Sequence, residues 1–261
     1  MVFNLLRISV VSIALCLGLH IRAQETPVFG YRIVNVFPHD GNAFTQGLFL
    51  LDGHLYESTG QYGESSIRQI ELKTGKVLKI QRFPDFVFGE GITHWDGQII
   101  GLTWRNNIGF KWDLNSFERL SQFKYKGEGW GLTQDGHALI MSDGTSSLRF
   151  VDPSTMNVIR RIDVTARGSK IPNVNELEWI NGTLYANIWQ SNYIAQMDPK
   201  TGAVLAWLNL NGLLESQGPR PNGADVLNGI ADAGNGHLYV TGKRWPYLFE
   251  IEILKSVKEK R

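Results

Sequence analysis

The chain lacks the residue types on which several common sites depend. It has a single cysteine, Cys16, among 261 residues, so it cannot form an internal disulfide. Cys16 lies in a segment that we expect to be removed, which would leave the mature protein without a thiol nucleophile. The six histidines show no metal-ligand spacing. The sequence therefore argues against a zinc site and against a Ser-His-Asp triad.

A strong excess of charge is also absent. The chain has 26 basic and 25 acidic residues, a formal net charge of +1, and no long charge run or basic stripe. This composition argues against nucleic acid as a partner. The 43% of apolar residues is enough to bury a full core, and no long stretch has helical periodicity.

Residues 1–23 read as a secretory signal. Arg7 supplies the positive region, Ile8–Leu19 is apolar but short for a membrane span, and Ile21-Arg22-Ala23 is an acceptable cleavage site. We therefore expect a secreted or periplasmic protein that has no membrane contact after cleavage. Loss of two basic residues would leave 24 against 25 acidic ones, a mature net charge of −1. An uncleaved N-terminal anchor is the alternative.

One unit of short strands recurs five times in the remaining chain. Its first strands begin near Leu48, Ile92, Leu132, Leu177 and Ile230. Each first strand is followed by a dipeptide that suits the positive φ angles of a tight hairpin: Asp52-Gly53, Asp96-Gly97, Asp135-Gly136, Asn181-Gly182 and Asn235-Gly236. Further strands follow, among them Ile67–Leu72 and Leu148–Val151. Four strands in roughly 40–45 residues are typical of one blade of a β-propeller.

Five such units predict an all-β chain that folds as a five-bladed β-propeller. The fifth unit, Ile230–Ile253, has only three clear strands. We expect the missing strand at Tyr31–Phe37, where the N-terminal segment would join the last blade and close the ring without an open sheet edge. This predicts a single domain over residues 27–254, followed by a basic tail at 255–261. We expect a monomer.

The repeats place two sets of residues at one mouth of the central channel. The starts of the first strands hold Gln46, Glu90, Trp130, Asn175 and Asn228, and the ends of the second strands hold Gly60, Trp104, Asp143, Trp189 and Lys243. Their chemical types differ between repeats, whereas a scaffold role predicts similar residues. The difference favours a ligand site. Simpler roles stay open: the indoles could plug the channel, Lys243 and Asp143 could be paired rim charges, and Gln46 and Asn175 could cap strand ends.

Glu90 stands between two glycines, which let backbone or ligand approach closely. The simplest interpretation of a Gly-Glu-Gly turn is a solvated surface carboxylate. In a narrow slot lined by indoles, the same carboxylate would instead be desolvated. Desolvation raises a carboxyl pKa and suits acid/base work, so Glu90 is the candidate proton shuttle.

These segments resemble the plant and bacterial type of glutaminyl-peptide cyclotransferase over essentially the whole mature chain. The resemblance is carried by Phe44-Thr45-Gln46-Gly47-Leu48, Phe88-Gly89-Glu90-Gly91-Ile92-Thr93, Leu102-Thr103-Trp104, Gly129-Trp130-Gly131-Leu132, Asn175-Glu176-Leu177-Glu178-Trp179 and Thr241-Gly242-Lys243. It implies a five-bladed propeller that needs no catalytic metal and converts the N-terminal glutamine of peptides and proteins to pyroglutamate, with release of ammonia. A structural calcium ion is possible, since some relatives carry one, but the sequence does not place it.

The resemblance also assigns roles to residues. Catalysis falls on Glu90, and substrate binding falls on Phe44, Gln46, Trp104, Trp130, Asn175, Trp189 and Lys243. Two other functions stay open: a non-catalytic propeller that binds peptide termini, and a metal-dependent hydrolase, which the histidine and carboxylate spacing disfavours. The long segment at residues 215–223 is expected to flank the entrance, with Arg220 near the exit path.

Overall fold

The computed structural model describes residues 25–255, and this part of the chain is almost entirely strands and turns. The predicted signal at residues 1–23 and all but the first residue of the predicted tail lie outside it. The only helical element in the described part is a 3-10 turn, η1 (Leu214–Gln217). No helix in this range is both long enough and apolar enough to cross a membrane.

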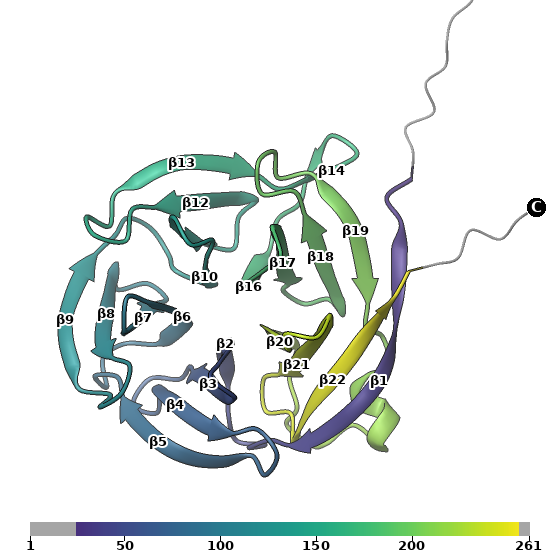
Figure 1. Ribbon diagram of the computed structural model, residues 1–261, viewed down its shortest axis with the longest axis horizontal. Coiled ribbons are helices and arrows are strands. Elements are labelled where there is room, and N and C mark those ends of the chain that lie inside the picture. Colours follow the sequence, from purple (N-terminus) through teal and green to yellow (C-terminus); the bar gives the residue numbers. More distant parts are fainter. Residues whose placement is uncertain (1–24, 256–261) are drawn as a thin grey trace, which may run out of the picture.

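The strands form sheets that stand around a common centre (Figure 1). Three sheets contain four consecutive strands each, in chain order from the centre outward. The first is β2 (Thr45–Leu51), β3 (His54–Thr59), β4 (Ser66–Glu71) and β5 (Lys76–Arg82). The second is β6 (Gly89–Trp95), β7 (Gln98–Thr103), β8 (Ile108–Asp113) and β9 (Arg119–Lys124). The third is β10 (Leu132–Gln134), β11 (Leu139–Met141), β12 (Ser147–Val151) and β13 (Val158–Asp163).

The remaining long strands are joined in one eight-stranded sheet. It combines β16 (Val174–Ile180), β17 (Thr183–Ile188), β18 (Tyr193–Met197) and β19 (Val204–Asn209) with β20 (Leu227–Asp232), β21 (His237–Gly242), β22 (Tyr247–Leu254) and β1 (Val28–Pro38). Its order is β16-β17-β18-β19-β1-β22-β21-β20. A small hairpin, β14 (Thr165–Ala166) and β15 (Ser169–Lys170), lies between the third and fourth groups along the chain.

β1 brings the two ends of the described chain together (Figure 1). It pairs antiparallel with β22 from Gly30 to Pro38, and only two of its residues pair in parallel with β19. The strand predicted at Tyr31–Phe37 is therefore present. Directly after it, His39 donates its backbone N–H to Pro246 O at 3.0 Å, and its ring Nε2 lies 3.0 Å from Glu57 Oε1 on β3. This contact connects the last strands of the chain with the first sheet.

The predicted hairpin turns are of two kinds. In Asp52-Gly53, Asp96-Gly97 and Asn181-Gly182 both residues have positive φ, as a tight two-residue hairpin requires. In the other two turns only the glycine of the dipeptide has positive φ, so the prediction of tight hairpins there is wrong. Asp135 Oδ1 instead accepts the N–H groups of His137 and Ala138, at 2.8 and 2.7 Å. Such a side-chain cap stabilises a longer turn.

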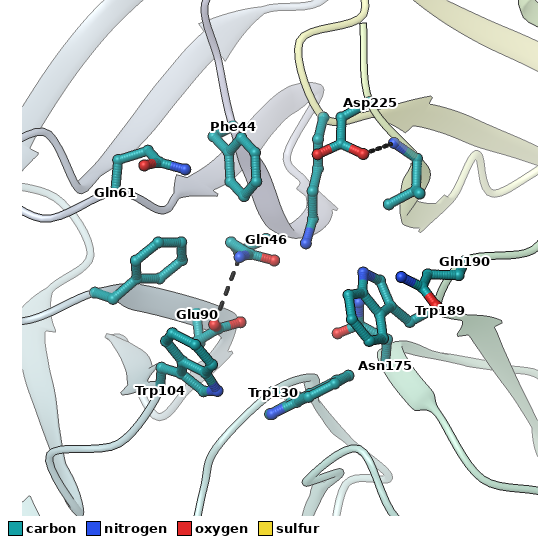
Figure 2. A pocket seen from close by; sticks show the side chains of 13 residues that line it. Phe44, Gln46, Gln61, Glu90, Trp104, Trp130, Asn175, Trp189, Gln190 and Asp225 are labelled. Atoms are coloured by element: carbon teal, nitrogen blue, oxygen red, sulfur yellow. Dashed lines mark hydrogen bonds between the residues drawn. The ribbon is translucent and has the colours of Figure 1, made fainter.

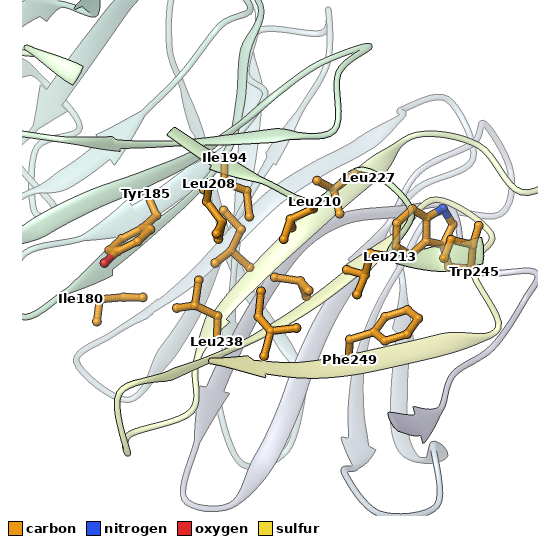
Figure 3. Close-up of a cluster of buried hydrophobic side chains, with 14 residues drawn as sticks. Ile180, Tyr185, Ile194, Leu208, Leu210, Leu213, Leu227, Leu238, Trp245 and Phe249 are labelled. Atoms are coloured by element: carbon orange, nitrogen blue, oxygen red, sulfur yellow. The ribbon is translucent and has the colours of Figure 1, made fainter. Parts of the chain in front are cut away.

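The hydrophobic core lies between neighbouring groups of strands. Its largest cluster packs side chains of β18 and β19 against β20, β21 and β22, with Leu213 and Trp245 at one end (Figure 3). Another cluster joins Phe49 and Tyr56 of the first sheet to Phe110 and Trp112 of the second. Since adjacent groups share these clusters, the apolar faces of each group are covered by its neighbours.

The innermost strands approach one another closely at the centre. A Cβ on Gly91 would lie 2.5 Å from Leu132 N, and one on Gly131 would lie 2.1 Å from Asn175 O, so only glycine fits. In the fourth repeat the corresponding residue is Glu176, which is fully buried. Its carboxylate accepts the N–H groups of Leu48 and Ile230, at 3.3 and 2.9 Å. Glu176 thus connects the innermost strands of three groups.

Candidate active site

Four of the predicted ring residues lie at irregularities in the innermost strands. The pairing shifts around Gln46, around Glu90, around Asn175 and around Asn228. These strands also begin three residues before the predicted positions, so the four residues belong to the strands and do not precede them. A bulge bends a strand and redirects a side chain, and here it frees each residue from the regular alternation of the sheet.

The second set of ring residues follows the ends of the second strands. Backbone N–H groups at these positions continue the pairing: Trp104 donates to Phe88 O at 3.0 Å, and Lys243 donates to Val226 O at 2.9 Å. Gly60 occupies the equivalent position in the first sheet. A Cβ there would lie 2.2 Å from the ring of Phe88, so glycine leaves the space that this ring fills.

All eight residues predicted for catalysis or binding line one pocket of about 430 Å³ (Figure 2). Of the other ring residues, Gly60, Asp143 and Asn228 do not line it. The complete lining is Phe44, Gln46, Gln61, Phe88, Glu90, Trp104, Trp130, Asn175, Trp189, Gln190, Asp225, Val226 and Lys243.

Glu90 is 5% exposed and supplies the buried carboxyl group of the pocket. Its Oε1 accepts a long hydrogen bond of 3.5 Å from Gln46 Nε2, and no residue of the described chain donates to its Oε2. Burial raises the pKa of Glu90 well above its usual range. The nearby ammonium of Lys243 opposes this rise, and the carboxylate of Glu128 adds to it.

Asn228 fixes the orientation of the carboxamides of Gln46 and Asn175 in the pocket. Its Nδ2 donates to Thr45 O at 3.0 Å and to Gln46 Oε1 at 3.4 Å, and its Oδ1 accepts from Asn175 Nδ2 at 2.9 Å. Gln46 therefore directs its N–H groups toward Glu90. Asn175 directs its oxygen toward the middle of the pocket (Figure 2), and this buried Oδ1 has no hydrogen-bond partner within residues 25–255.

Lys243 supplies a buried cation. Its Nζ lies 4.9 Å from the centre of the Phe44 ring, and it forms no ion pair within residues 25–255. Burial lowers the pKa of Lys243, and the negative charges of Glu90 and Asp225 oppose that shift. The alternative that Lys243 pairs with Asp143 is wrong. The described residues show no ion pair between them, and Asp143 instead lies 3.7 Å from the guanidinium of Arg149.

Aromatic rings form the walls. Trp130 and Trp189 meet edge to face with their centres 5.5 Å apart, and Phe88 contacts Trp104 in the same way at 5.7 Å. The rings leave the pocket open between them, so they do not simply plug the channel. Glu128, which we did not single out from the sequence, accepts the indole N–H groups of both Trp104 and Trp130.

Five lining residues were not predicted: Gln61, Phe88, Gln190, Asp225 and Val226. A signal for four of them is present in the repeats. Phe88 and Val226 occupy the position that Phe44 has in the first repeat, and Gln61 and Gln190 directly follow two ring positions. Asp225 has no such signal, because the loop before β20 is not repeated.

That the segment at residues 215–223 flanks the entrance stays a prediction. Arg220 does not line the pocket. Its guanidinium pairs with Glu215 at 3.1 Å and donates to the backbone oxygen of Asp225 at 2.5 Å. Arg220 thus connects this loop to a residue of the pocket wall without reaching the pocket itself.

Within residues 25–255, no group of three or more His, Cys, Asp or Glu side chains is arranged so that it could hold a metal ion. Glu90 is the only buried carboxyl group among the lining residues. The exposed Asp225 lies at the other side of the pocket (Figure 2). The buried polar groups of the pocket are therefore one carboxyl group, the carboxamides of Gln46 and Asn175, and an ammonium, which can bind and exchange protons with an uncharged amide and an amine.

Comparisons with known proteins agree with one another. Residues 7–253 match the model of the family described as glutamine cyclotransferase. A glutaminyl-peptide cyclotransferase of Arabidopsis thaliana is 45% identical over 231 residues, which are 86% of this chain and 71% of that protein. The crystal structure of Myxococcus xanthus glutaminyl cyclase superposes with a TM-score of 0.83 at 35% identity, over 89% of this chain and 100% of that one.

Proposed function

Because the chain belongs to the glutamine cyclotransferase family, we propose that it is a glutaminyl-peptide cyclotransferase. The substrate is the N-terminal glutamine of a peptide or protein. Its α-amine attacks the side-chain carbonyl carbon, the C–N bond to the carboxamide nitrogen breaks, and the products are a pyroglutamyl peptide and ammonia. The observation that carries the proposal is the convergence of Glu90, Gln46, Asn175 and Lys243 in one pocket walled by indoles.

The first task of the site is to fold the substrate. Both reacting groups belong to the same residue, so holding the side chain bent toward its own amine brings them into contact. Positioning of this kind contributes a large share of the rate acceleration in intramolecular reactions. The walls formed by Trp104, Trp130 and Trp189 suit a bent glutaminyl side chain and exclude water, which would otherwise compete by hydrolysing the amide.

Glu90 is the proton shuttle in this mechanism. The attacking amine must lose a proton, and the leaving nitrogen must gain one. Glu90 Oε2 accepts no hydrogen bond within the described chain, so it can take the proton from the amine and return it to the nitrogen that leaves. A carboxyl pKa raised by burial is closer to neutral pH, which suits transfer in both directions.

The other polar groups divide into donors and an acceptor. Negative charge develops on the carbonyl oxygen as the ring closes, and the N–H groups of Gln46 or the ammonium of Lys243 can stabilise it. The unpartnered Oδ1 of Asn175 is an acceptor, so it suits the N–H groups of the carboxamide or of the departing ammonia. Binding a group that satisfies this oxygen removes the cost of burying it alone.

We further infer that the strand groups are the blades of a five-bladed propeller closed by β1. The grouping of four consecutive strands and the antiparallel pairing of β1 with β22 support this inference.

We also propose that the chain is exported as a monomer to the periplasm or the cell exterior. The proposal of export rests on residues 1–23, and mass spectrometry of the N-terminus of the exported protein would test it. Light scattering of the purified protein would test the monomer.

Ammonia release from a glutaminyl peptide tests the proposed function. We expect stoichiometric ammonia and a product lighter by the mass of ammonia, both with and without a strong chelator. A non-catalytic peptide-binding propeller would bind the peptide and release nothing. A metal-dependent enzyme would lose all activity with the chelator and regain it with one specific metal.

A further inference from the structure

Glu128 lies between β9 and β10 and connects two walls of the pocket from behind. Its Oε2 accepts Nε1–H of Trp104 at 2.7 Å and Nε1–H of Trp130 at 2.9 Å, while Oε1 accepts Nε–H of Arg105 at 3.1 Å. Trp104 follows β7, whereas Trp130 precedes β10, so the two indoles belong to neighbouring groups of strands. Glu128 itself does not line the pocket.

We propose that Glu128 is a positioning residue that holds the indoles of Trp104 and Trp130 at a fixed separation, as the walls of the slot for the glutaminyl side chain. This proposal rests on the proposed function. An indole has a single N–H donor and a broad second side-chain torsion, so one hydrogen bond largely decides the ring's orientation. Because both indoles share one carboxylate oxygen, their orientations depend on each other.

The backbone around Glu128 is held in place by other groups. The guanidinium of Arg149, whose side chain is 3% exposed, donates to the backbone oxygens of Lys126 and Glu128, both at 2.5 Å. Gly129 donates its N–H to Trp104 O at 3.1 Å. A Cβ on Gly129 would lie 2.5 Å from Tyr125 Oη, so glycine permits this close path. The carboxylate is therefore presented from a fixed loop.

The outer side of the arrangement is closed by Arg105. Its guanidinium lies 3.7 Å from the centre of the Trp104 ring, while its Nε bonds to Glu128. Partial burial alone would raise the pKa of Glu128, but the hydrogen bonds from the two indoles and from Arg105 outweigh it and lower that pKa. Glu128 therefore stays ionised, and a charge-assisted bond to each indole is stronger than a neutral one.

The charge of Glu128 also acts on Glu90. The charged and titratable groups around Glu90 are the ammonium of Lys243, the carboxylate of Glu128 and the phenol of Tyr125; Asp225 lies beside Lys243, and Arg105 beside Glu128. Of these, the carboxylate of Glu128 favours the protonated form of Glu90, whereas Lys243 favours the ionised form. Removing the charge of Glu128 should therefore make Glu90 ionise at lower pH.

Two variants separate these effects. Glu128→Gln removes the charge and keeps one acceptor oxygen, whereas Glu128→Ala removes both. We expect KM for a glutaminyl dipeptide to rise about tenfold in Glu128→Ala, in which both indole N–H groups lose their acceptor, and by less in Glu128→Gln, which keeps one acceptor oxygen. The acidic limb of the pH–rate profile should move to lower pH in both. The exposed Glu118→Gln is the matched control and should change neither.

The kinetics of both Glu128 variants are compared with those of the wild type. If the wild type releases ammonia and both Glu128 variants keep its KM and its pH profile, the proposal is wrong. A loss of thermal stability with unchanged kinetics would also overturn it, because it would make Glu128 a structural residue only. If the wild type itself releases no ammonia, the proposed function fails, and acrylamide quenching of tryptophan fluorescence decides the proposal alone. Stronger quenching in Glu128→Ala than in the wild type would support it, and equal quenching would overturn it.

Discussion

Asn175 donates its amide to Asn228 Oδ1 at 2.9 Å, and this bond leaves Asn175 Oδ1 buried in the pocket wall with no partner in the described residues 25–255. Asn228 cannot turn to release it, because both of its own N–H groups are engaged, at Thr45 O and at Gln46 Oε1. The fully buried carboxamide of Asn228 therefore orients Gln46 as a donor in the pocket and Asn175 as an acceptor.

Asn228→Asp should disturb the orientation of Gln46, since a carboxylate has no N–H to donate to Thr45 O or Gln46 Oε1, although it can still accept the N–H of Asn175. We expect kcat/KM to fall about tenfold to a hundredfold, on the order of 1–3 kcal/mol for buried groups left without partners. Steady-state kinetics with a glutaminyl peptide measure this, and circular dichroism checks the fold. Asn157→Asp, at an exposed position, is the control. Unchanged kinetics for Asn228→Asp would show that the orientation of Gln46 does not matter.

Glu90→Gln should keep the fold and lose nearly all turnover. The carboxamide is nearly isosteric, and Gln46 can still bond to it, but it cannot carry a proton. A positioned acid/base group contributes about 10²–10⁴-fold, so the rate of ammonia release should fall by that factor. Glu64→Gln, on the surface, should retain full activity. If purified Glu90→Gln kept more than about a tenth of the wild-type rate, another group would be the shuttle.

Lys243→Met should lower activity and move the acidic limb of the pH–rate profile. Lys243 holds the pKa of Glu90 below the level that burial alone would give, so its loss raises that pKa. If ionised Glu90 takes the proton from the amine, the acidic limb should move to higher pH, opposite to the shift expected for Glu128→Gln. A pH series of kcat measures both. Lys124→Met, at an exposed position, is the control, and an unmoved limb in Lys243→Met would place its charge outside the reaction.

Glu178 should make the fold less stable as the pH rises. Burial raises its pKa from 4.5 to about 8, so the folded state binds a proton that the unfolded chain has already released. The contribution of Glu178 to the free energy of unfolding is therefore greatest below about pH 4.5. It falls by up to a few kcal/mol by pH 8, since each unit of pKa difference corresponds to about 1.4 kcal/mol.

Glu178→Gln mimics the protonated form. Its oxygen can still accept Asp232 N–H, and its amide can donate to Thr133 Oγ1. Urea unfolding between pH 5 and pH 8 should show a flatter dependence of the free energy of unfolding on pH than in the wild type. Glu90 and Glu176 keep raised pKa values in this variant, so the dependence should weaken and not vanish. An identical slope in both proteins would contradict the prediction.

The local features of this protein follow from its sequence alone. Alternating apolar residues and Asp-Gly or Asn-Gly turns predicted the strands, and the missing fourth strand of the last repeat predicted that β1 joins β22. Overlaying the repeats also brought ten residues from distant segments to one place, and seven of them line the same pocket. Phe44, which completes the eight predicted site residues in that pocket, was indicated only by the resemblance to the family. This works because equivalent positions of repeated units occupy equivalent places around a common centre.

The contacts between particular side chains, in contrast, became visible only in the folded chain. No spacing in the sequence indicates that Glu128 bonds to Trp104 and Trp130, that Arg149 pairs with Asp143 in place of Lys243, or that Asn228 orients Asn175. The contacts of Glu128 with Trp104 and of Asn228 with Asn175 cross between neighbouring groups of strands, and bulges in β16 and β20 redirect Asn175 and Asn228. A repeat fixes the position of a residue in its own unit, whereas hydrogen-bond partners depend on the packing between units.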